Sequence, residues 1–331
     1  MTAQYDVAAI GNAIVDVISP AQDAFLVAEG MAKGSMALID DDRAAQLYDR
    51  MAAGIETSGG SAANTVAGIA SLGGTAAYIG KVAQDQLGDV FAHDIRAIGV
   101  QFDIPRLLDG PATARCLINV TPDGQRTMST FLGASNQLTA ADVDPDLITA
   151  SSILYLEGYL FDPEAARRAF AKATAIARTN SRMIALTLSD SFVVERHRAA
   201  LLGFIDSEVD IVFANEAEIC ALFETKDVNA AIGALRGRAR IAAVTRGEHG
   251  STILAGDDLH QIAVRPVDQV VDTTGAGDQY AAGFLFGLAR GRSFADCGAL
   301  GSIAAAEVIA HYGPRPQVSL QTLAAAAGIQ A

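Results

Sequence analysis

The sequence has no tryptophan and only three cysteines, Cys116, Cys220 and Cys297. An odd number of cysteines with no CxxC pair predicts reduced thiols in a cytoplasmic protein. The five histidines show no HExxH or other paired spacing, so a zinc site is not expected. No uncharged apolar run is long enough to span a membrane, and the first residues lack the basic and apolar regions of a signal peptide. The absences therefore favour a cytoplasmic protein with no membrane-spanning part.

Positive charge is also scarce. Lysine and arginine number 24 against 38 aspartates and glutamates, which gives a formal net charge of −14. This balance argues against nucleic acids and anionic membranes as partners. It also means that any phosphate-binding site has to be built from local groups. The 331 residues, half of them hydrophobic, suffice for one large α/β domain or two smaller ones.

Short apolar runs alternate with helical periodicity along the second half of the chain. The pattern predicts strands at 151–156, 182–188, 209–214, 240–245 and 250–255, with helices at 163–178, 194–204 and 215–223. Repeated strand–helix units indicate a mostly parallel sheet with helices on both faces. Ligands bind such sheets beyond the carboxyl ends of the strands. Polar or small residues follow several of these ends, namely Gly11, Ser189, Asn215 and Thr245.

The first half of the chain is more varied. We expect strands at 5–10, 13–18, 36–39 and 75–82, and helices at 40–51, 58–73 and 86–97. Two further runs, 113–120 and 126–131, flank a Pro-Asp-Gly turn, which is typical of a hairpin because proline presets φ and glycine accepts a positive φ.

The most informative stretch is 271–280, where a Gly-Ala-Gly turn leads into an apolar helix. The first N–H groups of a helix have no internal partner and favour an anion. Gly275 and Gly277, with Ala276 between them, carry no large side chain that would keep a phosphate away. Asp278 then stands beside this anion hole, where a carboxylate suits a general base for a hydroxyl. Ordinary helix capping explains the same residues without any catalytic role.

Two motifs carry a resemblance. The sequence Asp-Thr-Thr-Gly-Ala-Gly-Asp at 272–278 looks like the C-terminal signature of the ribokinase-like (phosphofructokinase-B type) carbohydrate and nucleoside kinases. Gly-Gly-Ser-Ala-Ala-Asn-Thr at 59–65 resembles the N-terminal signature of that family. The resemblance implies a ribokinase-like α/β fold in which residues 1–331 form one kinase domain. It also implies a small β-sheet lid made of segments near 13–19, 35–39 and 112–132.

On the acceptor side the sequence looks most like adenosine kinases. The resemblance implies that polar residues hold the sugar hydroxyls, that an apolar slot holds the purine, and that one arginine faces the substrate. The residues at the sugar hydroxyls are Asn12, Asp16 and Asn64 together with the glycine pair Gly59 and Gly60. The slot is formed by Ile14, Cys116 and Phe192, and the arginine is Arg126. Without the resemblance, Asp16 and Arg126 would be read as solvated side chains, and Phe192 fits the core equally well.

On the nucleotide side the resemblance implies ATP and Mg²⁺ as cofactors and leaves a need for K⁺ open. The residues implied along ATP are Asn215, Thr245, Gly247 and Gly250. Glu218 would organise Mg²⁺ through water, which suits an ion that keeps most of its waters. Asp272 and Thr274 match the family's monovalent-cation loop. Asn215 and Glu218 also fit a capping box, and both roles can hold at one helix end.

The function that these expectations favour is a kinase that transfers the γ-phosphoryl group of ATP to a primary hydroxyl of a ribonucleoside, the 5′-hydroxyl of adenosine. A sugar kinase of the same family is the nearest alternative, and an inactive nucleoside-binding protein is another. A dinucleotide-binding oxidoreductase fits poorly, because Tyr280 stands where its Gly-rich motif needs glycine. The expected partner is a small nucleoside or sugar, bound by a monomer or a homodimer.

Overall fold

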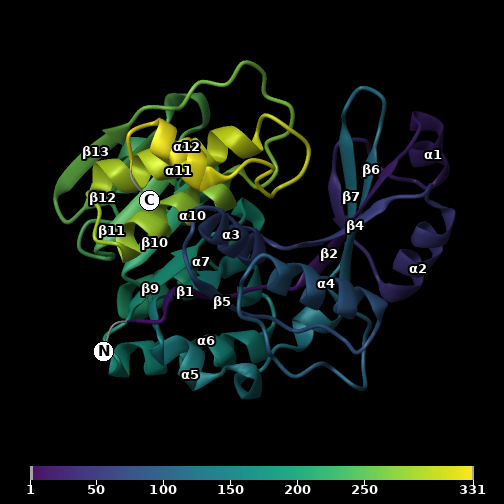
Figure 1. Cartoon of the computed structure of the whole chain (residues 1–331), viewed down its shortest axis with the longest axis horizontal. Helices are drawn as coiled ribbons and strands as arrows, with labels where there is room; N and C mark the ends of the chain where they lie inside the picture. The colour runs from purple at the N-terminus through teal and green to yellow at the C-terminus, as the bar shows by residue number, and fades with distance from the viewer. Residues whose placement is uncertain (1–2, 330–331) are drawn as a thin grey trace.

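The computed structural model describes residues 3–329 and contains two sheets. The larger one has eight strands in the order β13-β12-β11-β10-β9-β8-β1-β5, and the smaller one has five in the order β3-β7-β6-β2-β4. Figure 1 shows the small sheet standing beside the rest of the molecule. The expected α/β architecture, a mostly parallel sheet with a second small β-sheet, is confirmed.

Six strands of the large sheet are parallel, and β12 and β13 are added in antiparallel orientation at one edge. The parallel strands are buried on both faces, so their sequences are nearly continuous apolar runs. Their bounds are β1 Tyr5–Ile10, β5 Ala76–Ile79, β8 Ser151–Glu157, β9 Met183–Thr187, β10 Ile211–Asn215 and β11 Ile241–Thr245, followed by β12 Ser251–Ala255 and β13 Asp258–Ile262.

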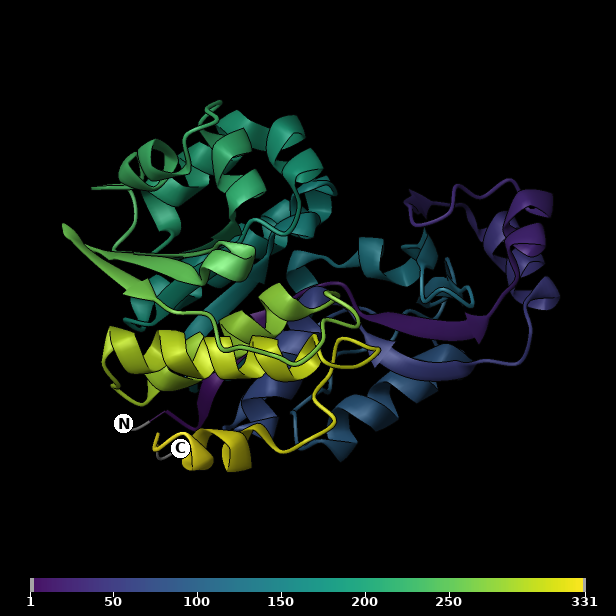
Figure 2. The same ribbon diagram turned by 90° about the horizontal axis from the view of Figure 1, so that it is seen from above.

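Helices cover both faces of this sheet (Figure 2). One face carries α3 (Ser61–Ser71), α10 (Ala276–Ala289) and α11 (Phe294–Val308), and α12 (Leu320–Ala326) packs outside them. The other face carries α5 (Pro145–Thr149), α6 (Glu164–Thr179), α7 (Ser191–Glu208), α8 (Glu216–Leu222) and α9 (Val228–Gly233). Aromatic rings join the layers, since Phe213 on β10 meets Phe284 of α10 edge to face at 5.4 Å.

The small sheet, here called the lid sheet, comprises β2 (Ile14–Pro20), β3 (Met36–Leu38), β4 (Ile55–Gly59), β6 (Ala114–Val120) and β7 (Arg126–Phe131). One of its faces is covered by a small apolar cluster that includes Val17, Leu117 and Leu47 of α2 (Asp41–Arg50). Asp16 lies directly opposite Cys116 across the parallel pair of β2 and β6. Side chains alternate along a strand, so Asp16 leaves the sheet on the face opposite Val17.

Four of the helices and strands were not expected from the sequence. They are α1 (Asp23–Ala28), α5, β4 and β13. The helix expected from residue 58 begins at Ser61 instead, because Ile14 on β2 pairs with Gly59 on β4 and draws residues 55–59 into the lid sheet. The remaining long helix, α4 (Gln86–Ala97), has the predicted bounds. Among residues 3–329, no helix combines the length and apolar character that crossing a membrane would require.

Candidate active site

The candidate site lies where the carboxyl ends of the central strands meet the first turns of α3 and α10. Asp278 is in the first turn of α10, and both oxygens of its carboxylate accept hydrogen bonds from α3. Ser61 Oγ donates to Oδ1 at 2.6 Å, and Asn64 Nδ2 donates to Oδ2 at 3.1 Å. The two signature motifs of the sequence therefore meet at one carboxylate.

The environment of Asp278 keeps its carboxylate available as a base. Burial raises the pKa of Asp278 above its ordinary value, while the hydrogen bonds from Ser61 and Asn64 lower it. A raised pKa makes a carboxylate a better proton acceptor, and the two donors hold it in the charged form that accepts. Its position and its chemistry fit the removal of a proton from a hydroxyl group.

The turn before α10 depends on its glycines for two different reasons. Gly275 has φ +79°, and a Cβ there would lie 2.6 Å from Cβ of Pro314, so both conformation and space require glycine. Gly277 has ordinary helical geometry, and a Cβ there would meet no atom within 4 Å. The space beside Gly277 is therefore open to a ligand. The N–H of Ala276 already donates to the carbonyl oxygen of Thr273 at 3.2 Å, so of the three expected anion donors it is the one already engaged.

Asp16 enters from the lid sheet and remains only 8% exposed. The pKa of Asp16 is raised to about 6, because the effect of burial exceeds the lowering effect of the positive charges of Arg315 and Arg126. A Cβ on Gly59 would lie within 2.8 Å of the Asp16 carboxylate, so glycine is needed where β4 passes this side chain. A buried carboxylate of this kind can accept two hydrogen bonds from neighbouring hydroxyls.

Glu157, at the end of β8, organises the residues beneath the acceptor side. It is 1% exposed and accepts hydrogen bonds from the backbone N–H of Asn12 at 3.2 Å, from Asn12 Nδ2 at 2.7 Å and from the N–H of Ala62 at 2.9 Å. The pKa of Glu157 is raised to about 7, because the effect of burial exceeds the lowering effect of these donors. Oδ1 of Asn12 is buried with no partner among residues 3–329, so it is free to accept from a bound hydroxyl.

Next to Asp278, a single cavity collects polar groups from the ends of three strands. Its walls include Ser189, Asn215, Glu218 and Thr245 together with Gly277 and Asp278. Ser189 has φ +67°, a conformation that non-glycine residues rarely adopt, and its Oγ is buried without a partner in the described chain. Strain of this kind clusters at ligand sites. The cavity places hydroxyl and amide groups, with one further carboxylate, beside the open Gly277.

The carboxylate of Glu218 is held by the expected capping box. Its oxygens accept from the backbone N–H of Asn215 at 3.0 Å and from Asn215 Nδ2 at 2.7 Å, while Asn215 Oδ1 accepts from the N–H of Glu218 at 2.9 Å. The pKa of Glu218 is raised to about 7, first by burial and then by the negative charges of Asp190 and Asp278, although the hydrogen bond from the Asn215 N–H lowers it. Within residues 3–329 no cluster of three or more metal-ligating side chains occurs. Concentrated negative charge without a full ligand cage fits Mg²⁺ held through water and phosphate oxygens.

The Asp272 carboxylate is already paired. Oδ1 accepts from the N–H and Oγ1 of Thr274 at 3.0 and 2.7 Å, and Oδ2 lies 2.7 Å from Nη1 of Arg126 on β7. The Arg126 guanidinium also lies over the ring of Tyr312, 5.6 Å from its centroid. Since the guanidinium supplies the positive charge at this loop, the arrangement does not fit an additional monovalent cation at Asp272.

A comparison with protein families matches residues 31–321 to the pfkB family carbohydrate kinases. This chain belongs to that family. It is therefore a phosphotransferase with an alcohol group as acceptor, and its fold is ribokinase-like. It is 52% identical to the adenosine kinase from Sinorhizobium meliloti, with a TM-score of 0.91 over 98% of this chain and 100% of that one. A probable sugar kinase from Rhizobium etli CFN 42 is 48% identical, with a TM-score of 0.92 over 98% and 99% of the two chains. The adenosine kinase of Saccharomyces cerevisiae is 26% identical over 92% of this chain and 95% of the yeast protein.

In this pfkB-family kinase the residues expected to form the purine slot are not all together. Cys116 lies opposite Asp16 in the lid sheet, and burial raises the pKa of its thiol to about 12. Phe192, at the start of α7, is 72% exposed and lines a groove with the lid residues Met36 and Leu38. Neither Ile14 nor Cys116 is among the walls of that groove.

The residues expected along ATP are also divided. Thr245 lines the cavity beside Asp278, whereas Gly247 and Gly250 lie in the turn between β11 and β12 and are not among its walls. Gly250 has φ +78°, and the turn itself requires glycine there because a Cβ would clash with the carbonyl oxygen of Ile262. Structural need alone accounts for Gly250.

Three residues of the site were missed from the sequence: Ser61, Glu157 and Arg315. Two had a usable signal, because Ser61 lies inside the 59–65 motif and Glu157 is a charged residue that ends an otherwise apolar strand. Ser189 follows a strand end, but nothing in the sequence predicts its positive φ. No motif includes Arg315, which reaches the site only through tertiary contacts.

Proposed function

We propose that this protein is an adenosine kinase that transfers the γ-phosphoryl group of ATP to the 5′-hydroxyl of adenosine. The observation that carries the proposal is the Asp278 carboxylate, which accepts hydrogen bonds from Ser61 and Asn64 and lines the cavity beside Gly277. The 52% identity to the Sinorhizobium meliloti adenosine kinase supports adenosine as the acceptor. All of residues 1–331 would act as one kinase domain, either as a monomer or as a homodimer.

On the acceptor side, Asp16 and Asn12 would hold the ribose hydroxyls. The Asp16 carboxylate accepts hydrogen bonds, and the buried Oδ1 of Asn12 lacks a donor that a hydroxyl would supply. Asn64 would bind a hydroxyl beside Asp278. Gly59 and Gly60 carry no side chain, so the backbone can pass close to the Asp16 carboxylate and the Asn12 carbonyl. Gly60 has φ +98° and opens α3 next to the carbonyl of Asn12. Ile14 and Cys116 would line the base side, joined by Phe192 if α7 and the lid sheet approach each other.

Asp278 would take the proton of the 5′-hydroxyl as that oxygen attacks phosphorus. The alkoxide then forms a bond to the γ-phosphorus while the bond to the β,γ-bridging oxygen breaks, and ADP leaves. Backbone N–H groups at Gly277 and in the same helical turn would stabilise the negative charge on the transferred group. The Asp278 carboxylate repels phosphate oxygens, which suits a base more than a phosphate ligand.

The nucleotide side would use Asn215, Thr245 and Ser189 as polar contacts, with Gly247 and Gly250 in the neighbouring turn. Mg²⁺, when bound, would supply positive charge that offsets the negative charge of the phosphates. Glu218 would hold waters of that ion, because it lines the cavity beside Asp278 and the negative charges of Asp190 and Asp278 act on it. No step requires K⁺, since Arg126 meets the charge of Asp272.

The test is ADP release from ATP and Mg²⁺ with adenosine, inosine, ribose and fructose in parallel. We expect turnover with adenosine that exceeds turnover with either free sugar. Turnover with a free sugar only would retain the Asp278 chemistry and replace the acceptor, in line with the probable sugar kinase relative. Absence of ADP with every acceptor would favour an inactive nucleoside-binding protein.

A further inference from the structure

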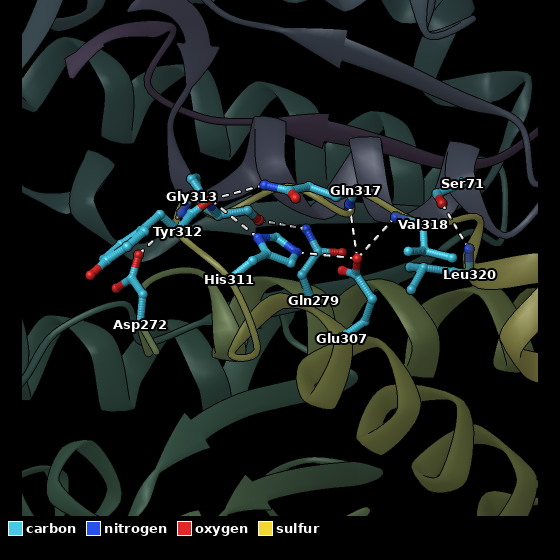
Figure 3. A network of polar contacts seen from close by, with 11 residues as sticks. Ser71, Asp272, Gln279, Glu307, His311, Tyr312, Gly313, Gln317, Val318 and Leu320 are labelled. Atoms are coloured by element: carbon cyan, nitrogen blue, oxygen red, sulfur yellow. Dashed lines mark hydrogen bonds and ion pairs between the residues drawn. The ribbon is translucent and has the colours of Figure 1, made fainter. Parts of the chain in front are cut away.

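The segment between α11 and α12, residues 309–319, is tied to the helix that carries Asp278 (Figure 3). Gln279 is fully buried, and its Nε2 donates to the carbonyl oxygens of Pro314 at 3.0 Å and Asn64 at 2.9 Å. Pro314 also packs against Gly275, where any Cβ would collide with it. One amide side chain thus joins this segment to both helices of the candidate site.

The same segment is anchored to α11 through a buried carboxylate (Figure 3). Glu307 Oε1 accepts from the backbone N–H groups of Gln317 at 2.9 Å and Val318 at 3.0 Å, and it lies 3.1 Å from Nε2 of His311. Backbone groups fixed on both sides leave little freedom for the residues between them. Arg315 is one of these residues.

Arg315 points from this segment into the acceptor side. Its Nη1 donates to Oγ of Ser58 at 2.5 Å, and its Nε donates to Oδ1 of Asn64 at 3.4 Å. Nδ2 of the same Asn64 amide donates to Asp278. The N–H of Ser58 in turn donates to Oδ2 of Asp94 at 3.0 Å. A donor at Oδ1 fixes which end of the Asn64 amide faces Asp278, because an amide has one acceptor end and one donor end.

We propose that Arg315 is a positioning residue for the acceptor site, which orients the Asn64 amide toward Asp278 and balances the buried charge of Asp16. This rests on the proposed function, in which the acceptor lies between Asp16 and Asp278. The Nη2 atom of Arg315 is buried with no partner among residues 3–329, so the guanidinium keeps donors for a bound molecule. A hydrogen-bond acceptor on the bound molecule could take up this donor.

The charged groups around Asp16 fix the sign of the expected pH effect. Arg315 and Arg126 favour its carboxylate form, Asp278 opposes it, and the Cys116 thiol opposite it has a pKa of about 12 and stays neutral. Loss of Arg315 removes the stronger of the two favourable charge interactions with Asp16, so the pKa of Asp16 should rise. Binding of hydroxyls by the carboxylate would then be lost at a higher pH than in the wild-type protein.

The test compares Arg315→Gln and Arg315→Lys with Arg236→Gln, which removes the same charge from an exposed position after α9. We expect Arg315→Gln to raise the KM for adenosine about 10- to 100-fold, the range for losing a hydrogen bond from a charged group, and to leave the KM for ATP within about 2-fold. Arg315→Lys keeps the charge but not the planar fork, so it should raise the adenosine KM less. Arg236→Gln should match the wild-type protein.

A second readout needs no acceptor. The carboxyl carbon of Asp16, assigned with Asp16→Asn, is followed by NMR against pH in ligand-free protein. An upward move of its titration in Arg315→Gln, absent in Arg315→Lys, supports the proposal. An unchanged titration overturns it, as does an unchanged adenosine KM in a protein that turns over adenosine. If Arg315→Gln does not fold, Arg315→Lys with a wild-type adenosine KM overturns it. If the wild-type protein ignores adenosine, the proposed function fails and the titration alone decides the role of Arg315.

Discussion

Substituting Gly277 with alanine separates the catalytic demand at the anion hole from the demands of folding. The residue sits in the first turn of α10 with helical φ, and a Cβ there would meet no atom within 4 Å. Gly→Ala at such a position stabilises a helix by up to about 1 kcal/mol, because the unfolded chain loses freedom. In a chain of this size that is a rise in Tm of about 2 °C.

The kcat of Gly277→Ala should fall, although its stability rises. The new methyl group would occupy the space beside the N–H groups that we assign to the transferred phosphoryl, and losing one such donor costs about 100-fold or more in kcat. Thermal unfolding and steady-state kinetics of Gly277→Ala together measure both effects. Gly203→Ala in α7 is the matched control, because its Cβ also meets no atom and it lies far along the chain from the motifs. Full kcat in Gly277→Ala, or a lower Tm, would refute the reasoning.

Three further predictions follow from the same contacts. The pKa of Glu157 is about 7 in the native protein and 4.5 in the unfolded chain, so between these pH values only the native carboxyl keeps its proton, and its contribution to stability falls as pH rises from about 4.5 to 7. Glu157→Gln should therefore flatten the dependence of the unfolding free energy on pH in this range, measured by urea unfolding. An unaltered slope would count against the raised pKa. Asn215→Ala should lower the free energy of unfolding by about 1 kcal/mol and raise the KM for ATP. Thr139→Ala, in a second capping box, should lower stability by a similar amount without changing the KM for ATP. The same KM for ATP in both variants would argue against a nucleotide-binding role for Asn215. Because Arg126 pairs with Asp272, kcat should be the same in potassium chloride and in tetramethylammonium chloride. A kcat that depends clearly on K⁺ would show that this ion pair does not replace a cation in the active enzyme.

The parts of the site that the sequence predicts are those that are local. Gly275, Gly277 and Asp278 belong to one turn and the helix that follows, so spacing and helix chemistry were sufficient to place them. The capping box of Asn215 and Glu218 is local for the same reason, and the structure has it as expected.

What could not be predicted depends on contacts between distant segments. β4 has no alternating pattern and is a strand because β2 pairs with it, and β13 is largely polar and exposed at the sheet edge. The contact of Ser61 with Asp278 spans 217 positions. Arg315 reaches Asn64 only because Gln279 and Glu307 fix the segment that carries it.

The measurement that tests the central claim most directly is ³¹P NMR of the products from adenosine, ATP and Mg²⁺, for the wild-type protein and Asp278→Asn. The account predicts ADP and 5′-AMP in equal amounts from the wild-type protein, and a rate reduced by several orders of magnitude in the variant, whose amide cannot accept the hydroxyl proton. Phosphate on a different oxygen, inorganic phosphate in place of 5′-AMP, or undiminished turnover in Asp278→Asn would contradict it.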